Sequence, residues 1–261
     1  MRILAITGAG VSAESGIPTF RGKDGYWRNL DATKLATPEA FQRNPKLVWE
    51  WYRERRQRIR NARPNAAHKA ITKLQRHADE FLLITQNVDD LHVRAGLPKE
   101  KMVEIHGDIF VTRCSRCDFS YLAGGGSLEP PGNRAAQNGR LRSIAPTLEN
   151  DVDLSRCPEC AALMRPEVVW FGERLPWNEV QRVEEYLDRV ACDLVIVAGT
   201  TATFGYIIDW AVRARAPDGE LIEVNPEETP LSSFATQLVR EAAAIALPRI
   251  VDTIVDCRSR A

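Results

Sequence analysis

Two pairs of cysteines are the strongest chemical feature of this sequence. Cys114 and Cys117 are separated by two residues, and Cys157 and Cys160 repeat the same spacing. Four thiolates spaced in this way can bind one zinc ion tetrahedrally, and four protein ligands leave no coordination position for a reacting water. Four reduced cysteines that share no ligand would have no reason to repeat the Cys-x-x-Cys spacing. The pattern therefore predicts one structural zinc ion.

A glycine-rich turn follows the first apolar run of the chain. The segment from Gly8 through Gly10 to Ala13 matches Gly-x-Gly-x-x-Gly/Ala, in which glycines let backbone amides approach a dinucleotide pyrophosphate. A tight strand-to-helix turn without a ligand also selects glycine. In an ordinary dehydrogenase an acidic residue ends the second strand about 20 positions later, but Asp24 and Asp31 lie in polar and aromatic sequence instead. The turn is therefore compatible with a dinucleotide but not with an ordinary dehydrogenase half.

Four further side chains could contribute to a site, and each has a simpler interpretation. Arg21 could clamp a phosphate with two parallel hydrogen bonds, although an exposed loop arginine would look the same. Asn87 and Asp89 follow a second apolar run, where polar groups either meet a ligand or cap a helix starting near Asp89. His106, with an ordinary pKa near about 6.5, could act as a general base or have no catalytic role. Spacing alone leaves these alternatives open.

The elements that must position these residues alternate along the chain. Short apolar runs rich in β-branched residues predict buried strands at 3–7, 81–85, 194–198 and 221–224. Helical patterns lie between them, at 38–41, 47–59, 66–76, 177–190 and 204–215. This alternation predicts an α/β fold with a parallel sheet covered on both faces. Residues 114–160 break it and form a loop-rich inserted module with Gly124-Gly125-Gly126 and Pro130-Pro131.

The composition narrows the class of protein. Thirty-five basic and thirty-five acidic residues leave no net charge, so no overall field attracts nucleic acid or an anionic membrane. The apolar stretch before Gly8 is too short for a signal peptide, and no run approaches the roughly 18 apolar residues of a membrane span. Cys192 and Cys257 have no partner in the cysteine pattern and are expected to behave as small apolar residues. We expect a cytoplasmic monomer with neither nucleic acid nor membrane as partner.

Taken together, these motifs resemble the sirtuins over nearly the whole chain. The resemblance rests on the segments 8–22, 86–89 and 106–107 and on the four cysteines, in this order. Further along, residues 165–173 resemble the substrate-binding strand of that family, and Gly199-Thr200-Thr201 and Asn225-Pro226-Glu227 resemble its ribose and adenine contacts. Thr201 replaces a serine common at that position and keeps the hydroxyl. The segment 123–150 has no clear counterpart, so its role stays open.

The resemblance implies an NAD-dependent protein-lysine deacylase acting on acylated-lysine proteins or peptides. It implies a large Rossmann-like domain from residues 1–23, 66–106 and 170–261, and a small domain from the helical insertion 24–65 and the zinc module 107–169. NAD would be a co-substrate: the acyl oxygen attacks the nicotinamide ribose, nicotinamide leaves, and His106 acts as general base on a ribose hydroxyl. The acyl group ends on ADP-ribose. The residues that the resemblance assigns to NAD are Gly8, Ala9, Gly10, Ser12, Ala13, Ile17, Pro18, Phe20, Arg21, Tyr26, Trp27, Gln86, Asn87, Asp89, Gly199, Thr200, Thr201, Asn225, Pro226, Glu227 and Ala243.

A Tyr-x-x-Arg pair gives a finer expectation about the acyl group. Tyr52 and Arg55 are three residues apart in a predicted helix and share a face. The pair is similar to that of class III sirtuins, in which it accepts the far carboxylate of succinyl- or malonyl-lysine. The alternative is a solvated basic face that includes Arg53, Arg56 and Arg58. The resemblance also implies peptide binding by Val169, Trp170, Phe171 and Gly172.

Two other functions fit part of the sequence. An ADP-ribosyltransferase would use the same NAD residues but transfer ADP-ribose to an acceptor, without forming O-acyl-ADP-ribose. A non-enzymatic zinc-ribbon module for nucleic acid or protein would need no NAD motif, and the neutral net charge disfavours its nucleic-acid form. The deacylase accounts for every motif.

Overall fold

The structure, a computed structural model, describes residues 1–19, 26–27, 30–123 and 154–259 of the chain. It contains two compact units. One consists of Met1–Thr19, Ala62–Ile105 and Leu175–Ala261, and the other of Phe20–Asn61 and His106–Arg174. The sequence-based division grouped His106 and residues 170–174 with the larger part and residues 62–65 with the smaller part, whereas the contacts group each of them the other way.

A parallel sheet forms the centre of the first unit. Among the described residues it has six strands in the order β11-β10-β9-β1-β4-β5, and every neighbouring pair is parallel. The four predicted strands are confirmed, and the two edge strands β5 and β11 were not predicted. The strands are β1 (Arg2–Thr7), β4 (Glu80–Thr85), β5 (Met102–Glu104), β9 (Cys192–Ala198), β10 (Arg215–Val224) and β11 (Gln237–Val239).

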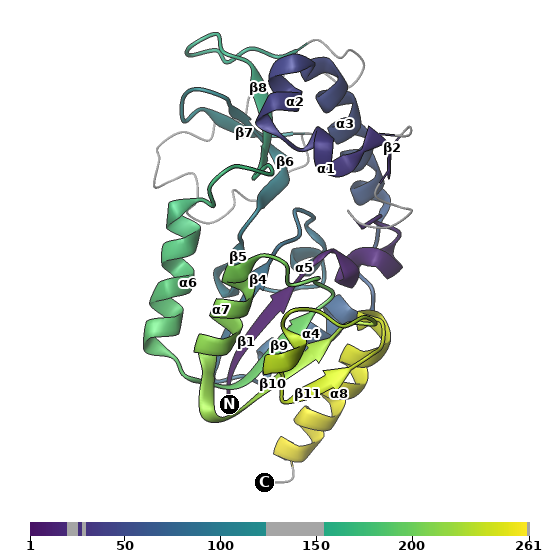
Figure 1. Ribbon diagram of the computed structural model, residues 1–261, viewed down its shortest axis with the longest axis vertical. Coiled ribbons are helices and arrows are strands. Elements are labelled where there is room, and N and C mark those ends of the chain that lie inside the picture. The colour runs from purple at the N-terminus through teal and green to yellow at the C-terminus, as the bar shows by residue number, and fades with distance from the viewer. Residues whose placement is uncertain (20–25, 28–29, 124–153, 260–261) are drawn as a thin grey trace. The chain divides into compact units, whose positions relative to one another are not determined.

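The strands are apolar throughout because both faces of the sheet are covered. Ile3 and Ala5 of β1 belong to a core cluster shared with helices α4 and α8, whereas Leu4 and Ile6 face a second cluster shared with α6 and α7. Figure 1 shows α6 and α8 on opposite sides of the sheet. The helical segments of this unit are η1 (Ala9–Ser15), α4 (Ala66–Arg76), α5 (Leu91–Arg94), η3 (Lys99–Lys101), α6 (Trp177–Arg189), α7 (Gly205–Ala214), η4 (Ser232–Phe234) and α8 (Ala243–Ser259).

The strand order creates a switch point between β1 and β9. From β1 the chain continues to β4 and β5 on one side, whereas β9 continues to β10 and β11 on the other. In open parallel sheets ligands bind outside the carboxyl ends of the strands at such a point. The turns that follow β1 and β9 are therefore the structural place to look for a bound dinucleotide.

The second unit combines helices with a small antiparallel sheet. Its described strands pair as β7-β6-β8, with the separate hairpin β2-β3. The Asp31 and Thr37 side chains cap α1 and α2 by accepting backbone N–H groups. The elements are β2 (Tyr26–Trp27), β3 (Leu30–Asp31), α1 (Ala32–Leu35), α2 (Pro38–Arg43), α3 (Pro45–Asn61), β6 (Gly107–Cys114), β7 (Ser120–Leu122) and β8 (Met164–Val168). Across the described part of the chain, no helix combines the length and apolarity needed to cross a bilayer.

Candidate functional site

The turns after β1 and β9 lie in direct contact. Gly8 N–H donates to the Ala198 carbonyl (3.0 Å), and Gly10 N–H donates to the Gly199 carbonyl (2.8 Å). A Cβ on Gly10 would lie 2.8 Å from the Gly199 Cα, and Gly199 itself has φ +62°. The segment after the turn is the 3₁₀ helix η1 rather than an α-helix. Close packing of two backbones thus accounts for these glycines even before a ligand is considered.

Polar side chains of the segment that follows β4 meet those of η1 and of the turn after β9 at the same edge of the sheet. Gln86 Nε2 donates to Thr200 Oγ1 (2.9 Å), and Asn87 Nδ2 donates to Ser12 Oγ (3.1 Å). Ser12 Oγ donates to Asp89 Oδ2 (2.9 Å), while Asp89 Oδ1 accepts the Leu91 N–H at the start of α5 (3.1 Å). Asp89 therefore belongs to the polar cluster and also accepts a backbone N–H of the first turn of α5, whereas the N-cap position itself is Asp90, whose side chain makes no capping bond.

Two buried histidines, not predicted as site residues, lie beneath this cluster. His68 is 0% and His92 is 2% exposed, and their rings are 4.7 Å apart. The two ring nitrogens of His68 have separate partners: Nδ1 lies 3.3 Å from the Asn65 backbone nitrogen and 3.1 Å from Asn65 Oδ1, and Nε2 lies 3.3 Å from Ser12 Oγ. Burial lowers the pKa of His68 to about 4, and the Arg94 charge lowers it as well. The sequence signal was Asn65-x-x-His68 at a helix start, which the structure shows to be a capping box.

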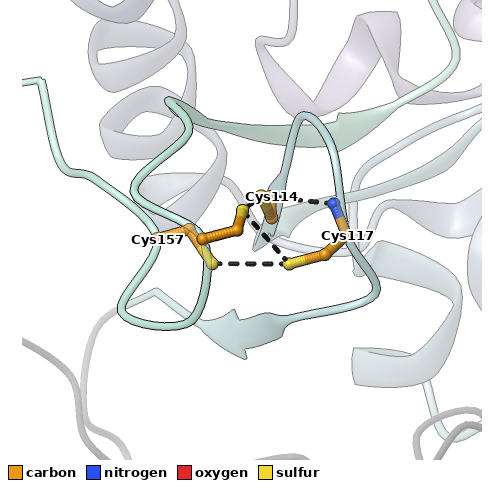
Figure 2. A group of neighbouring side chains, drawn as sticks. Cys114, Cys117 and Cys157 are labelled. Atoms are coloured by element: carbon orange, nitrogen blue, oxygen red, sulfur yellow. Dashed lines mark hydrogen bonds between the residues drawn. The ribbon is translucent and has the colours of Figure 1, made fainter.

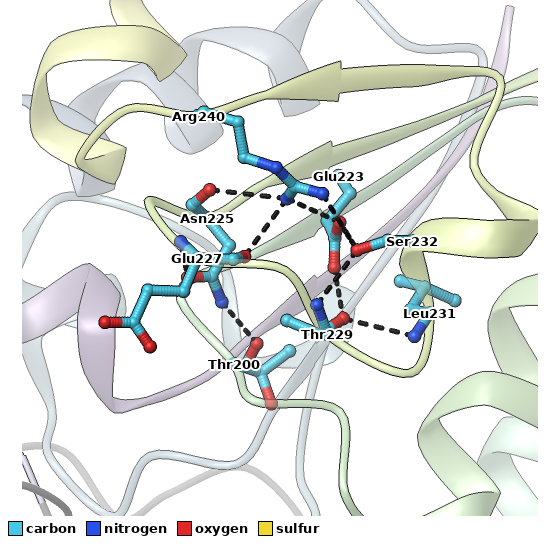
Figure 3. Close-up of polar contacts among 8 residues, drawn as sticks. All are labelled: Thr200, Glu223, Asn225, Glu227, Thr229, Leu231, Ser232 and Arg240. Atoms are coloured by element: carbon cyan, nitrogen blue, oxygen red, sulfur yellow. Dashed lines mark hydrogen bonds and ion pairs between the residues drawn. The ribbon is translucent and has the colours of Figure 1, made fainter.

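The loop after β10 reaches the same edge. Asn225 Nδ2 donates to the Thr200 carbonyl (2.6 Å), and Glu227 N–H donates to Asn225 Oδ1 (3.2 Å) (Figure 3). Thr201 is exposed, with Oγ1 3.4 Å from Thr203 Oγ1. Pro226 and Glu227 are also exposed, whereas Ala243 is buried at the first position of α8 with its side chain in the core.

The remaining residues expected to bind NAD belong to the segment of the chain from Ala9 to Trp27. Ala9 and Pro18 are half-buried, Ala13 is exposed and Ile17 is buried. Phe20 and Arg21 lie outside the described residues, as does the Gly- and Pro-rich segment from position 124 to 153. Tyr26 and Trp27 form β2.

In the second unit, His106 lies beside the segment predicted to bind peptide. The half-buried His106 directly precedes β6, and its carbonyl accepts the Val169 N–H (2.9 Å). Phe171 N–H donates to the Ala36 carbonyl (2.9 Å), and the Phe171 side chain is 40% exposed. Gly172 has φ +88°, which suits glycine at the bend that follows.

The Tyr52 and Arg55 pair occupies a partly buried face of α3. Tyr52 is 2% exposed, and its hydroxyl oxygen accepts the Trp170 Nε1–H (2.9 Å). Burial raises the pKa of Tyr52 to about 12, although the nearby Arg55 charge lowers it. Arg53 is exposed, as a solvated basic face would require, but Arg56 is 9% exposed and donates to backbone carbonyls of β6. The solvated-face interpretation is therefore wrong for Arg56.

The segment predicted to bind the substrate peptide contains an ion pair that was not predicted. Arg165 and Glu173 form two hydrogen bonds of 2.6 and 2.9 Å, and the Arg165 guanidinium stacks 3.4 Å from the Trp170 ring centroid. Glu173 Oε2 also accepts the Trp170 N–H (2.9 Å), and Arg165 Nη2 donates to the Val168 carbonyl (2.8 Å). Burial raises the pKa of Glu173, but the hydrogen bonds from Arg165 and Trp170 lower it further than burial raises it. The pair fixes the bend between Val168 and Glu173.

The four predicted cysteine ligands form one cluster. Their sulfur atoms lie within 4.8 Å of one another, with Sγ–Sγ distances of 3.4 Å for Cys114–Cys160 and 3.5 Å for Cys117–Cys157. Figure 2 shows three of these side chains converging on one point. A tetrahedron with Zn–S bonds of about 2.3 Å requires sulfur separations near about 3.8 Å, so the cluster fits one zinc ion. Backbone N–H groups of Arg116 and Cys117 also donate to Cys114 Sγ.

The two other cysteines lie outside the cluster and differ from each other. Cys192 is buried, as expected for a small apolar residue. Cys257 is exposed on α8, so the same expectation is wrong for it.

The fold and these groups define a class of protein: a parallel α/β dinucleotide-binding fold in a chain that also carries a four-cysteine zinc module. The sequence pattern of the Sir2 family matches residues 8–204. The NAD-dependent protein deacylase of Aquifex aeolicus is 44% identical over 253 residues, covering 97% of this chain and 95% of that protein. The chain belongs to the Sir2 family.

Solved structures agree with this assignment. A Sir2 homologue in complex with NAD superposes with a TM-score of 0.80 at 39% identity, covering 98% of this chain and 90% of the other. A Sir2 protein in complex with a p53 peptide and NAD⁺ gives a TM-score of 0.73 at 26% identity, covering 100% of this chain and 94% of the other.

Proposed function

We propose that the chain is an NAD-dependent protein-lysine deacylase that prefers acyl groups ending in a carboxylate, such as succinyl and malonyl. Deacylation with NAD is the activity of this Sir2-family enzyme, in keeping with the name of its relatives. The preference for acidic acyl groups is the finer proposal. The observation that carries it is the buried phenol of Tyr52 next to the Arg55 guanidinium. We further propose that the enzyme acts as a cytoplasmic monomer on acylated-lysine proteins.

Each unit contributes a different part of the reaction. In the first, the turn Gly8–Gly10, Asn87, Asp89 and the loop at Asn225 would bind NAD, which supplies ADP-ribose as the acyl acceptor. The contacts between these groups support the assignment because they gather at the switch point of the sheet. In the second unit His106 would take a proton from a ribose hydroxyl.

The zinc module has a structural part in this proposal. Cys114, Cys117, Cys157 and Cys160 would hold the ion, and their four sulfurs complete its coordination. The ion would hold together the segments that carry the four cysteines, next to the small antiparallel sheet. It would take no part in acyl transfer, because a closed tetrahedral site has no place for substrate.

The acyl specificity follows from the chemistry of the two side chains on α3. A guanidinium can donate two parallel hydrogen bonds to a carboxylate. With a pKa near 12, Tyr52 stays neutral at pH 7, so its hydroxyl can donate a further bond without repelling the anion. An acetyl group has no carboxylate that could accept hydrogen bonds from these donors.

The test is a panel of acetyl-, malonyl- and succinyl-lysine peptides with the wild type and Arg55→Met. Loss of a hydrogen-bonded charge pair costs about 2–4 kcal/mol, so kcat/KM for succinyl-lysine should fall roughly 30- to 900-fold. The acetyl-lysine rate should change little. Arg53→Met, which removes an exposed arginine from the same helix, is the matched control and should leave both rates unchanged.

Two outcomes would contradict parts of the proposal. An equal loss on acetyl- and succinyl-lysine would remove the assignment of Arg55, while leaving the deacylase intact. Nicotinamide release without O-acyl-ADP-ribose, detected by mass spectrometry, would instead indicate ADP-ribosyl transfer to another acceptor.

A further inference from the structure

A buried carboxylate lies beside the loop after β10. Glu223 is 2% exposed, and burial of an unpaired carboxylate would cost several kcal/mol. Its Oε1 accepts the Thr229 hydroxyl, and its Oε2 accepts Ser232 Oγ–H (2.5 Å) and Arg240 Nη1–H (2.8 Å). Figure 3 shows these groups converging on Glu223. The carboxylate is therefore paired and fully hydrogen-bonded.

Arg240 does more than neutralise this charge. Its Nη1 also lies 3.1 Å from the Glu227 carbonyl and 3.5 Å from the Asn225 carbonyl, and its Nη2 donates to Ser232 Oγ (2.9 Å). One guanidinium thus connects Glu223, near the end of β10, to the backbone of the following loop and to Ser232. The fixed fork of an arginine can hold several acceptors at once, which a lysine ammonium on a flexible stem does less well.

The loop held by Arg240 carries groups assigned to the nucleotide. The Asn225 side chain bridges to the Thr200 carbonyl (2.6 Å) and also accepts the Glu227 N–H (3.2 Å). The position of the Asn225 side chain therefore depends on the backbone that Arg240 holds. Within this group Glu223 is buried, whereas Arg240 and Glu227 are exposed.

We propose that Arg240 is a positioning residue for NAD: anchored on Glu223, it holds the 225–227 loop in the conformation that receives the nucleotide. This inference rests on the proposed function, which assigns the loop to NAD. Without the guanidinium the backbone carbonyls of Asn225 and Glu227 lose their side-chain donor, and part of the binding energy of NAD must be used to order the loop. NAD binding should weaken while the chemistry, carried by other residues, proceeds at its usual rate once NAD is bound.

The experiment measures KM for NAD, KM for peptide, kcat and the Kd of NAD in Arg240→Met and Arg240→Lys. For Arg240→Met we expect KM and Kd for NAD to rise at least about 10-fold, with kcat and peptide KM within about twofold. Arg240→Lys should give an intermediate rise. Arg249→Met is the matched control, because Arg249 pairs with Glu241 on the exposed surface of the same unit, and it should behave as wild type.

A double variant separates positioning from charge neutralisation. Glu223→Gln combined with Arg240→Met removes both charges, so no unpaired buried carboxylate remains. If Arg240 positions the loop, the NAD constants stay raised in the double variant. Recovery of wild-type constants would overturn the proposal, because neutralising Glu223 would then be the whole role of Arg240. Unchanged constants in Arg240→Met, or equal losses in kcat and both KM values, would also overturn it. A wild type that binds NAD but deacylates nothing would refute the proposed function, while the Kd comparison would still decide the role of Arg240.

Discussion

The two buried histidines make folding stability depend on pH in a predictable window. The folded protein holds His68 neutral, with a pKa of about 4 against an ordinary value of 6.5. Between these pH values the unfolded chain binds more protons than the folded one, so stability falls as the pH falls and is regained as it rises. Above pH 6.5 this contribution is constant. Burial also lowers the pKa of His92 well below its ordinary value, so His92 acts in the same direction.

The magnitude follows from the difference between the two pKa values of His68. That difference corresponds to about 3 kcal/mol when the pH has fallen to 4, and about 2 kcal/mol is already lost at pH 5. This is a large share of the 5–15 kcal/mol by which domains are typically stable. His92 adds to it, because its Nδ1 has no hydrogen-bond partner within the described residues and a proton there would meet no acceptor.

The assay is chemical denaturation at pH 7 and pH 5 for the wild type and His68→Gln. The loss of unfolding free energy between the two pH values should shrink by about 2 kcal/mol in the variant, whatever its absolute stability. His77→Gln, which changes an exposed histidine just after the same helix, should keep the wild-type loss. Equal pH dependence in wild type and His68→Gln would refute the reasoning. If His68→Gln does not fold, NMR titration of the wild-type histidine rings replaces it, and a His68 ring that titrates near pH 6.5 gives the same refutation.

Two further predictions concern the second unit. Cys157→Ala should abolish zinc binding and lower the Tm by roughly 10 °C or more, as metal analysis and calorimetry would show, whereas Cys257→Ser should keep the zinc content and Tm of the wild type. Arg56→Met should cost about 2–4 kcal/mol in denaturation, because it leaves two carbonyls and a hydroxyl of β6 unsatisfied. The exposed Arg58 on the same helix provides the comparison, since Arg58→Met should change stability by less than about 0.5 kcal/mol; equal costs at the two positions would contradict the structural role of Arg56.

Local sequence patterns predicted the centre of the fold well because the information there is local. The central strands are continuous apolar runs, and the cysteine pairs carry their own spacing. The edge strands β5 and β11 have three residues each, too few for a period to stand out. The helix α8 contains Pro248. Because a proline inside a helical pattern usually marks the end of a helix, the sequence did not indicate a continuous helix there.

Some of the unpredicted residues are polar groups whose partners lie farther along the sequence than a local pattern reaches. Arg56 contacts a strand more than fifty positions later, and nothing in its neighbourhood distinguishes it from the exposed Arg53. Glu223 and Arg240 likewise form an ion pair that becomes visible only when β10 pairs with β11. Charge and spacing alone cannot show which member of a basic helix is buried, because that depends on the surface against which the helix packs.

The glycine turn illustrates how a binding motif can be read in two ways, and it affects how nucleotide binding should be tested. Gly10 and Gly199 are needed for the contact between the β1 and β9 turns, so replacing either would disturb that contact whether or not NAD binds there. Loss of activity in such a variant would therefore say little about the ligand. Asn225 and Arg240 lie at the same edge but are not part of that contact. Variants there change the loop without forcing the two backbones apart, so a selective loss of NAD affinity at these positions would be evidence for the dinucleotide itself.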